Sequence, residues 1–228
     1  GDGELSVSDD NATAEVSISS GTVTISNIGS LAAGTKVVVT VTAEEGTNHN
    51  TASATYTLTI GTKSIASAKV TTMADQTYTG EEIKPEPVVT IGTTTLVRDE
   101  DYTLTYPTDV TNVGEKTIII EGIGNYAGTI TAEYNIVRAA GKVTLSEESG
   151  SIDYGTASAT FTATRIGDGE LSVSDDNATA EASIKNGIVT LSNIGSLAQG
   201  TEVKVTVSAA EGTNHTAASA VYTLAIGT

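Results

Sequence analysis

A long internal duplication constrains the fold of this chain more than any other feature of its sequence. Residues 1–62 recur as residues 167–228, and 48 of the 62 paired positions are identical. We call these two stretches the first copy and the second copy. Because self-similarity of this kind marks repeated structural units, the chain is expected to consist of three parts, with a different region between the copies.

The differences between the two copies indicate which side chains face inward. Val37, Val39 and Val41 are unchanged in the second copy, whereas their neighbours Lys36 and Val38 are replaced. Identity that alternates with substitution at a period of two is typical of a strand with one buried face. The same alternation predicts four inward-facing residues near the end of the copy: Ala54, Tyr56, Leu58 and Ile60.

Residues 140–166, which we call the leading segment, precede the second copy. Two strands are expected there, at 141–146 and 156–163, on either side of a turn-rich stretch. Together with the strands expected in the second copy they make about seven short strands, the pattern of an antiparallel immunoglobulin-like sandwich. The dipeptide Asn186-Gly187 predicts a hairpin turn between two of them. The predicted fold is therefore all-β.

The first copy has no counterpart of the leading segment in this sequence, which begins inside the repeat pattern. We expect the sequence to be part of a longer protein and residues 1–62 to form a module that lacks its first two strands. Such a module exposes part of its core and unpaired backbone, which invites completion by another chain. We expect it to be either less ordered or docked on a strand of a neighbouring molecule.

The region between the copies, residues 63–139, has a different pattern and is called the middle region. Strands are expected at 66–72, 86–91, 102–106, 116–121 and 129–137, separated by glycine and proline. The junctions with both copies are only a few residues long, too short to act as flexible tethers. We predict three modules arranged end to end: an incomplete immunoglobulin-like module (1–62), a second type of β-sandwich (63–139) and a complete immunoglobulin-like module (140–228).

Composition excludes several classes of function. Lys and Arg total 11 against 28 Asp and Glu, and the net charge of −17 repels nucleic acids and anionic lipid surfaces. The absence of Cys excludes disulfides, cysteine nucleophiles and thiolate metal sites. No apolar run approaches the ~20 residues that span a bilayer. We therefore expect no nucleic-acid partner and no membrane insertion of this segment.

The two histidines, His49 and His215, occupy equivalent positions in a polar turn of each copy. A catalytic base needs a partner that positions it, and each histidine is expected to lie alone in an exposed loop. The sequence therefore predicts no catalytic residue, no cofactor and no enzyme activity.

Acidic residues in loops are the candidates for a metal site, because Ca²⁺ takes six to eight oxygen ligands. None of them has the spacing of a helix-loop-helix calcium site, and Asp9, Asp10 and Asn11 are expected to bond the backbone of a turn instead. We predict no metal-binding residue, and calcium binding at module junctions stays an open alternative. The acidic residues considered are Asp2, Glu4, Asp9, Asp10, Asp99, Glu100, Asp101, Asp168, Glu170, Asp175 and Asp176.

Tyrosines and lysines of the middle region suggest two further possibilities. Exposed tyrosines on one face would indicate a sugar-binding surface, but alternation with Leu104 and Ile136 favours core positions. An internal Lys–Asn cross-link is the second possibility, with Lys69, Lys84 or Lys116 as the donor. The five tyrosines are Tyr78, Tyr102, Tyr106, Tyr126 and Tyr134.

Two stretches resemble known families. The stretch GDGELSVSDDNATAEASIKNGIVTLSNIGSLAQGTEVKVTVSA resembles the group 2 bacterial immunoglobulin-like repeats, although Leu5 and Leu171 stand where those repeats usually have Trp. The middle region resembles another repeat of bacterial cell-surface proteins. That resemblance is carried by Tyr78-Thr79-Gly80, Ile83-Lys84-Pro85, Asp101-Tyr102-Thr103, Asn112-Val113-Gly114, and Gly124-Asn125-Tyr126 with Gly128-Thr129.

These resemblances imply an extracellular, multi-domain protein of a bacterial cell surface. We expect this segment to be a non-catalytic stalk, spacer or adhesive repeat, whose partners are neighbouring modules of the same protein. The alternative is an extracellular binding module for a glycan or a host protein, with recognition by the middle region.

Overall fold

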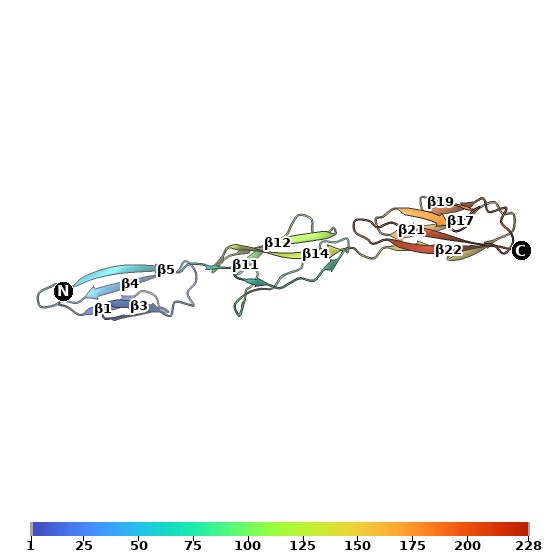
Figure 1. Cartoon of the computed structure of the whole chain (residues 1–228). Helices are drawn as coiled ribbons and strands as arrows, with labels where there is room; N and C mark the ends of the chain where they lie inside the picture. The colour runs from blue at the N-terminus through green and yellow to red at the C-terminus, as the bar shows by residue number, and fades with distance from the viewer. Residues whose placement is uncertain (1, 228) are drawn as a thin grey trace. The chain divides into compact units, whose positions relative to one another are not determined.

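All regular secondary structure in the computed structural model is β-strand (Figure 1). The structure describes residues 2–227, and no helix occurs among them. Consequently, none of the described residues belongs to a helix that could cross a membrane. Valine and threonine are frequent in the strands because β-branched side chains are stiff and pack well on a pleated surface. The predicted all-β fold of tandem sandwich modules is confirmed.

The second copy and its leading segment form a sandwich of two four-stranded sheets. The strand orders are β15-β17-β20-β19 and β16-β22-β21-β18. Figure 1 shows β17 and β19 in one layer and β21 and β22 in the other. The strands are β15 (Lys142–Leu145), β16 (Ser149–Ile152), β17 (Ala159–Ile166), β18 (Leu171–Asp175), β19 (Glu181–Lys185), β20 (Ile188–Ser192), β21 (Glu202–Ala209) and β22 (Ala218–Ile226).

Strand β16 differs from the prediction, which placed a turn-rich stretch there. After β15 the chain crosses to the other sheet, and β16 pairs with β22 in parallel, Ile152 opposite Ile226. The sequence of β16, Ser-Gly-Ser-Ile, has little strand signal of its own, so the edge of β22 determines its pairing. The sandwich is therefore antiparallel except for this pair, and β17 begins at Ala159 rather than at residue 156.

The core of this sandwich contains the residues that the alternation predicted. Val203, Val205 and Val207 are all fully buried. Tyr222 of one sheet stacks on Phe161 of the other, with ring centroids 4.1 Å apart. The hairpin between β19 and β20 is also confirmed, because Asn186 and Gly187 both have positive φ, 51° and 77°, as a type I′ turn requires.

The first copy repeats these pairings with fewer strands. Its sheet has the order β1-β4-β5, and β2 and β3 form a separate hairpin. The register is the same as in the second copy, with Val7 opposite Val41 as Val173 is opposite Val207. Among residues 2–227, no strand pairs with the outer edge of β3 or of β5. The strands are β1 (Leu5–Asp9), β2 (Glu15–Ser19), β3 (Thr22–Ser26), β4 (Lys36–Ala43) and β5 (Ala52–Thr59).

The middle region contains shorter strands than predicted at its beginning. Its main sheet has the order β11-β12-β14-β8, and β10-β9-β7 and β13-β6 form smaller sheets. Pairing of β9 starts only at Val89 because Pro85 and Pro87 lack the N–H group that a ladder needs. The strands are β6 (Lys63–Ser64), β7 (Lys69–Val70), β8 (Gln76–Thr77), β9 (Val89–Ile91), β10 (Thr94–Thr95), β11 (Tyr102–Thr105), β12 (Gly114–Gly122), β13 (Tyr126–Ala127) and β14 (Thr129–Val137).

Contact density divides the chain into two compact units, one with the first copy and the other with the leading segment and the second copy. The long strands β12 and β14 of the middle region contribute to both units. The module boundaries at residues 62 and 139 therefore stay predictions. The first unit contains the chain up to Thr72, Glu86–Tyr106 and Ile118–Ala132; the second contains Met73–Pro85, Pro107–Thr117 and the chain from Glu133 onward.

Candidate functional site

Many polar contacts of the second unit converge on the loop between β21 and β22, residues 211–215, which we call the joint loop. Asp168 stabilises the shape of this loop. One of its carboxylate oxygens accepts a hydrogen bond from the backbone N–H of Asn214 at 3.0 Å, and the other lies 3.1 Å from Nδ1 of His215. These contacts lie within the second copy, so they hold the loop in shape separately from its contacts with the middle region.

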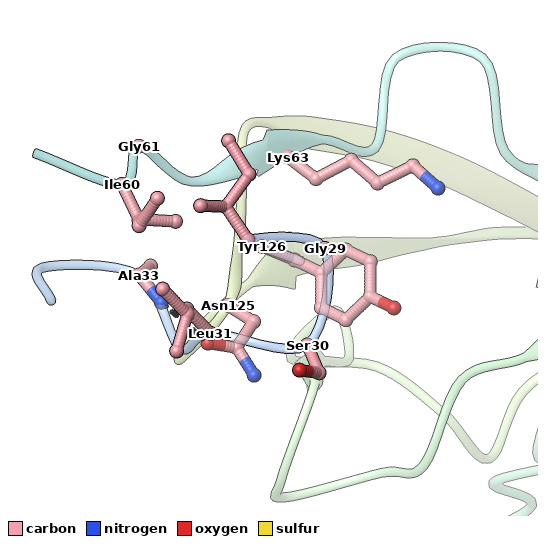
Figure 2. Close-up of a pocket in the computed structure, with 10 residues that line it drawn as sticks. Gly29, Ser30, Leu31, Ala33, Ile60, Gly61, Lys63, Asn125 and Tyr126 are labelled. Carbon is pink, nitrogen blue, oxygen red and sulfur yellow. Dashed lines mark hydrogen bonds between the residues drawn. The ribbon is translucent and has the colours of Figure 1, made fainter. Parts of the chain in front are cut away.

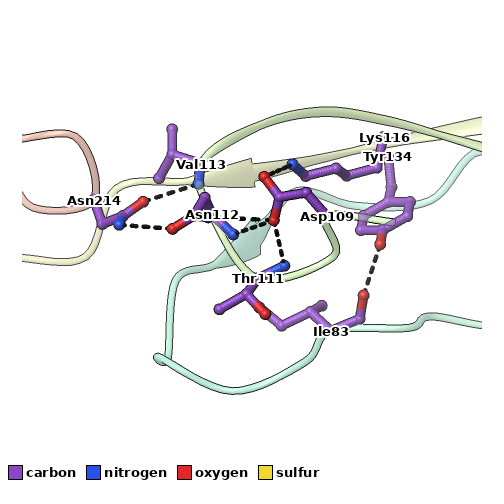
Figure 3. A network of polar contacts seen from close by, with 8 residues as sticks. All are labelled: Ile83, Asp109, Thr111, Asn112, Val113, Lys116, Tyr134 and Asn214. Atoms are coloured by element: carbon purple, nitrogen blue, oxygen red, sulfur yellow. Dashed lines mark hydrogen bonds and ion pairs between the residues drawn. The ribbon is translucent and has the colours of Figure 1, made fainter. Parts of the chain in front are cut away.

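Asn214 links the joint loop to the middle region (Figure 3). Its side-chain oxygen accepts a hydrogen bond from the backbone N–H of Val113 at 3.0 Å, and its Nδ2 donates to Oδ1 of Asn112 at 3.1 Å. These partners are 101 and 102 positions away in the sequence. Because the amide of Asn214 uses its donor and its acceptor together, the contact requires both loops in one orientation.

Asp109 fixes the middle-region side of this contact. One carboxylate oxygen accepts hydrogen bonds from the N–H groups of Thr111 (3.1 Å) and Asn112 (3.0 Å), and the other pairs with Nζ of the buried Lys116 at 3.2 Å. The amide of Asn112, then that of Thr111, lowers the pKa of Asp109 from 3.8 to about 2. Asp109 is therefore a charged carboxylate that holds the Asn112 loop in place.

Further side chains of the joint loop contact the end of the middle region. The ring of Tyr78 meets His215 edge-on, with centroids 5.3 Å apart. Arg138 donates from Nε to the carbonyl of Gly212 at 3.0 Å and pairs with Glu211 at 3.4 Å. These contacts are independent of Asn214, so the joint has several anchors.

The prediction that each histidine lies alone is wrong. In both copies the histidine pairs with an aspartate: His49 with Asp2 at 2.9 Å, and His215 with Asp168 at 3.1 Å. The two copies differ in how far the histidine is covered by other residues. The side chain of His215 is 18% exposed, whereas that of His49 is 62% exposed. The His–Asp pair thus orders the loop in both copies, and only the second copy's loop is covered.

The acidic residues mainly bond the backbone. Asp9 accepts from the N–H of Asn11 at 2.9 Å, as predicted for a turn, whereas Asp10 reaches the N–H of Val38 at 2.7 Å. Asp175 and Asp176 repeat these contacts in the second copy. Within residues 2–227, no group of three or more His, Asp or Glu side chains is placed to hold a metal ion. Asp101 accepts from the N–H of Val97, and the remaining candidates are exposed: Glu4, Asp99, Glu100 and Glu170.

The five middle-region tyrosines do not form an exposed platform. Tyr102 and Tyr134 are buried, as their alternation predicted, and their hydroxyls donate to backbone carbonyls. The other three are half-buried. Of the three lysines considered for a cross-link, Lys69 is exposed, and the other two form ion pairs: Lys84 with Glu82 and Lys116 with Asp109.

The first unit contains a pocket of about 480 Å³ beside the end of the first copy (Figure 2). On its rim, Oδ1 of Asn125 accepts a hydrogen bond from the N–H of Ala33 at 2.8 Å. Its apolar wall consists of Ile28, Leu31 and Ile60, which are only half-buried. The equivalent residues of the second copy are buried core residues: Ile194, Leu197 and Ile226.

The joint loop is expected to loosen in acid. The N–H of Asn214 is the largest cause that lowers the pKa of Asp168, from 3.8 to about 2. A lowered folded-state pKa stabilises the fold above the unfolded value, and this contribution is lost as the pH falls from about 3.8 towards 2. Titration of the Asp168 carboxyl carbon by NMR should give a midpoint near 2. A midpoint near 3.8 would mean that the carboxylate is not held in the loop.

Comparisons with known proteins do not identify a family. The sequence matches none of the protein families and none of the curated proteins with which it was compared. Among solved structures, it is similar to four cadherin repeats of Drosophila N-cadherin, at 12% identity and a TM-score of 0.37, over 98% of this chain and 66% of that one. A SusE-like surface polysaccharide-binding protein of Bacteroides thetaiotaomicron matches at 11% identity and a TM-score of 0.26, over 96% of this chain and 54% of that one. A trimodular endo-β-1,4-glucanase of Bacillus licheniformis matches at 11% identity and a TM-score of 0.28, over 71% of this chain and 38% of that one. At such low values, these likenesses carry no argument about function.

Proposed function

We propose that this chain is a non-catalytic structural segment, a stalk or spacer of an extracellular bacterial surface protein. In this proposal the middle region and the second copy are modules joined rigidly by the joint loop. The observation that carries it is the double hydrogen bond of Asn214 to Asn112 and Val113. The resemblance of both repeat types to bacterial surface repeats supports the extracellular setting.

A rigid joint needs contacts that a flexible linker would lack. A hydrogen bond contributes about 1 kcal/mol net, so one bond alone would not fix a joint. Here three side chains act on the same short loop. Asn214 contributes two hydrogen bonds, Arg138 a hydrogen bond and an ion pair, and Tyr78 a ring contact. Their sum restricts bending of the joint, which is what a spacer requires. The net charge of −17 also opposes non-specific association between the exposed surfaces of neighbouring repeats.

The two copies provide a matched pair of variants to test the joint. Asn214→Ala should increase hydrogen exchange at the Val113 amide by about tenfold or more, because this N–H loses its acceptor. Asn48→Ala is the control, since Asn48 is the equivalent residue and its side chain bonds Asp2. Exchange at Val113 should not change in that variant.

NMR measurement of hydrogen exchange at the Val113 amide in both variants tests whether Asn214 holds the joint. A selective effect of Asn214→Ala supports a joint held by side-chain contacts. If Val113 exchanges at the same rate in both variants and in the unaltered chain, Asn214 does not hold the joint and the rigid spacer loses its main support.

A further inference from the structure

The first copy has most of the inward-facing residues of the second copy, but only some of them are covered: Ala14, Val37 and Val39 are buried, whereas others are not. Tyr222 is 4% exposed, whereas its equivalent, Tyr56, is 59% exposed. Val23 is half-buried, whereas its equivalent, Val189, is fully buried. Because the registers of the paired strands are the same in both copies, the difference must come from what packs on them.

In the second copy, the leading segment covers these residues. Phe161 stacks on Tyr222, and β17 pairs with β20, Phe161 opposite Val189. On the other sheet, β16 pairs with β22, Ile152 opposite Ile226. The leading segment therefore occupies two strand edges and fills the core between them. In the first copy, the equivalent edges belong to β3 and β5, which we define, together with Val23, Ile25, Tyr56 and Ile60, as the acceptor face.

Two glycines of the second copy lie against the backbone of the leading segment. A Cβ added at Gly195 would lie 3.4 Å from the carbonyl oxygen of Gly155, and one at Gly227 would lie 3.1 Å from that of Ile152. Both neighbours belong to the leading segment. The equivalent residues, Gly29 and Gly61, have open space around them and no positive φ. The first copy thus keeps room for a backbone that its own described residues do not supply.

We propose that the acceptor face binds a polypeptide segment with the side-chain pattern of residues 141–166, contributed by another copy of this repeat. The two free strand edges bind its backbone, as β20 and β22 bind β17 and β16. The inward residues Ala159, Phe161 and Ala163 of such a segment fill the core, with the aromatic ring on Tyr56. A ligand without a β-strand backbone could not pair with both edges, and the segment must cross between the sheets as it does after Leu145.

A synthetic peptide of residues 141–166 tests this proposal on the whole chain. The peptide should bind at one site, with new exchange protection at the amides of Thr22–Ser26 and Ala52–Thr59. The variant Tyr56→Ala should weaken binding by about tenfold or more, because the aromatic stack and its buried area are lost. Tyr56 is exposed in the unbound chain, so its replacement should leave protection of the Val39 amide unchanged.

Peptide variants separate strand insertion from non-specific adhesion. Phe161→Glu in the peptide should abolish binding, because a charge would enter the core. Thr162→Glu is the control, since Thr162 of the second copy is exposed and its replacement should leave binding unchanged. The proposal is overturned if the peptide does not bind, if both peptide variants bind equally, or if protection appears in the second copy instead. A dimer of the chain that buries Tyr56 through a surface other than residues 141–166 of the partner molecule would also overturn it.

Discussion

Replacement of Tyr222 by alanine is expected to lower the free energy of unfolding of the second copy by about 3–5 kcal/mol, as for other buried aromatic residues. The side chain is 4% exposed and stacks on Phe161, so the change leaves a cavity between the two sheets. The same change at the equivalent Tyr56, which is 59% exposed, should alter stability by less than about 0.5 kcal/mol.

Urea unfolding of both variants, followed through resolved NMR signals of each copy, measures this difference. The two positions have the same residue type, the same strand register and nearly the same sequence around them. A difference between the two losses of unfolding free energy therefore measures the packing that the leading segment provides to Tyr222. Equal losses in the two copies would contradict an open first copy, because they would require Tyr56 to be buried in solution.

A second large effect is expected in the middle region. Ile118→Ala should destabilise this region by about 2–5 kcal/mol, because Ile118 is fully buried in β12. Ile119→Ala is the control, since Ile119 points to the other face of the same strand and is 44% exposed. If residues 63–139 are one module, protection against hydrogen exchange should fall throughout that range and persist in residues 140–228.

This pair of variants also tests the predicted module boundaries. Loss of protection that stops near residue 139 would support a boundary there. Loss that spreads equally through the second copy would show that the two regions unfold together, and the boundary at residue 139 would be wrong.

Alternation between the copies predicted the direction of side chains but not their burial. Tyr56 lies opposite Val39 in the sheet, on the inward face that the sequence indicated. It is nevertheless exposed, because burial also requires a second layer. Val37 and Val39 are buried, as Val203 and Val205 are in the second copy, whereas Tyr56 lacks the second layer that covers Tyr222. Periodicity is a local property of one strand, whereas burial depends on segments distant in the sequence.

The joint loop could not be predicted for the same reason. The contacts of Asn214 join residues about a hundred positions apart, and no local spacing marks them. The sequence contained one usable signal: the polar run Glu-Gly-Thr-Asn-His is identical in both copies, although an exposed loop would tolerate change. The His–Asp contact within each copy accounts for part of this identity, so the signal alone did not point to Asn112.

NMR relaxation of the backbone amide nitrogens tests most directly whether the joint is rigid. The proposed spacer requires residues 107–117 of the middle region and the strands of the second copy to tumble with one common rotational correlation time. Because Arg138 and Tyr78 also contact the joint loop, the single correlation time should split into two only when Asn214→Ala is combined with Arg138→Ala and Tyr78→Ala, and it should stay single in Asn48→Ala. Independent tumbling of the two regions in the unaltered chain would contradict a rigid joint and, with it, the proposed function.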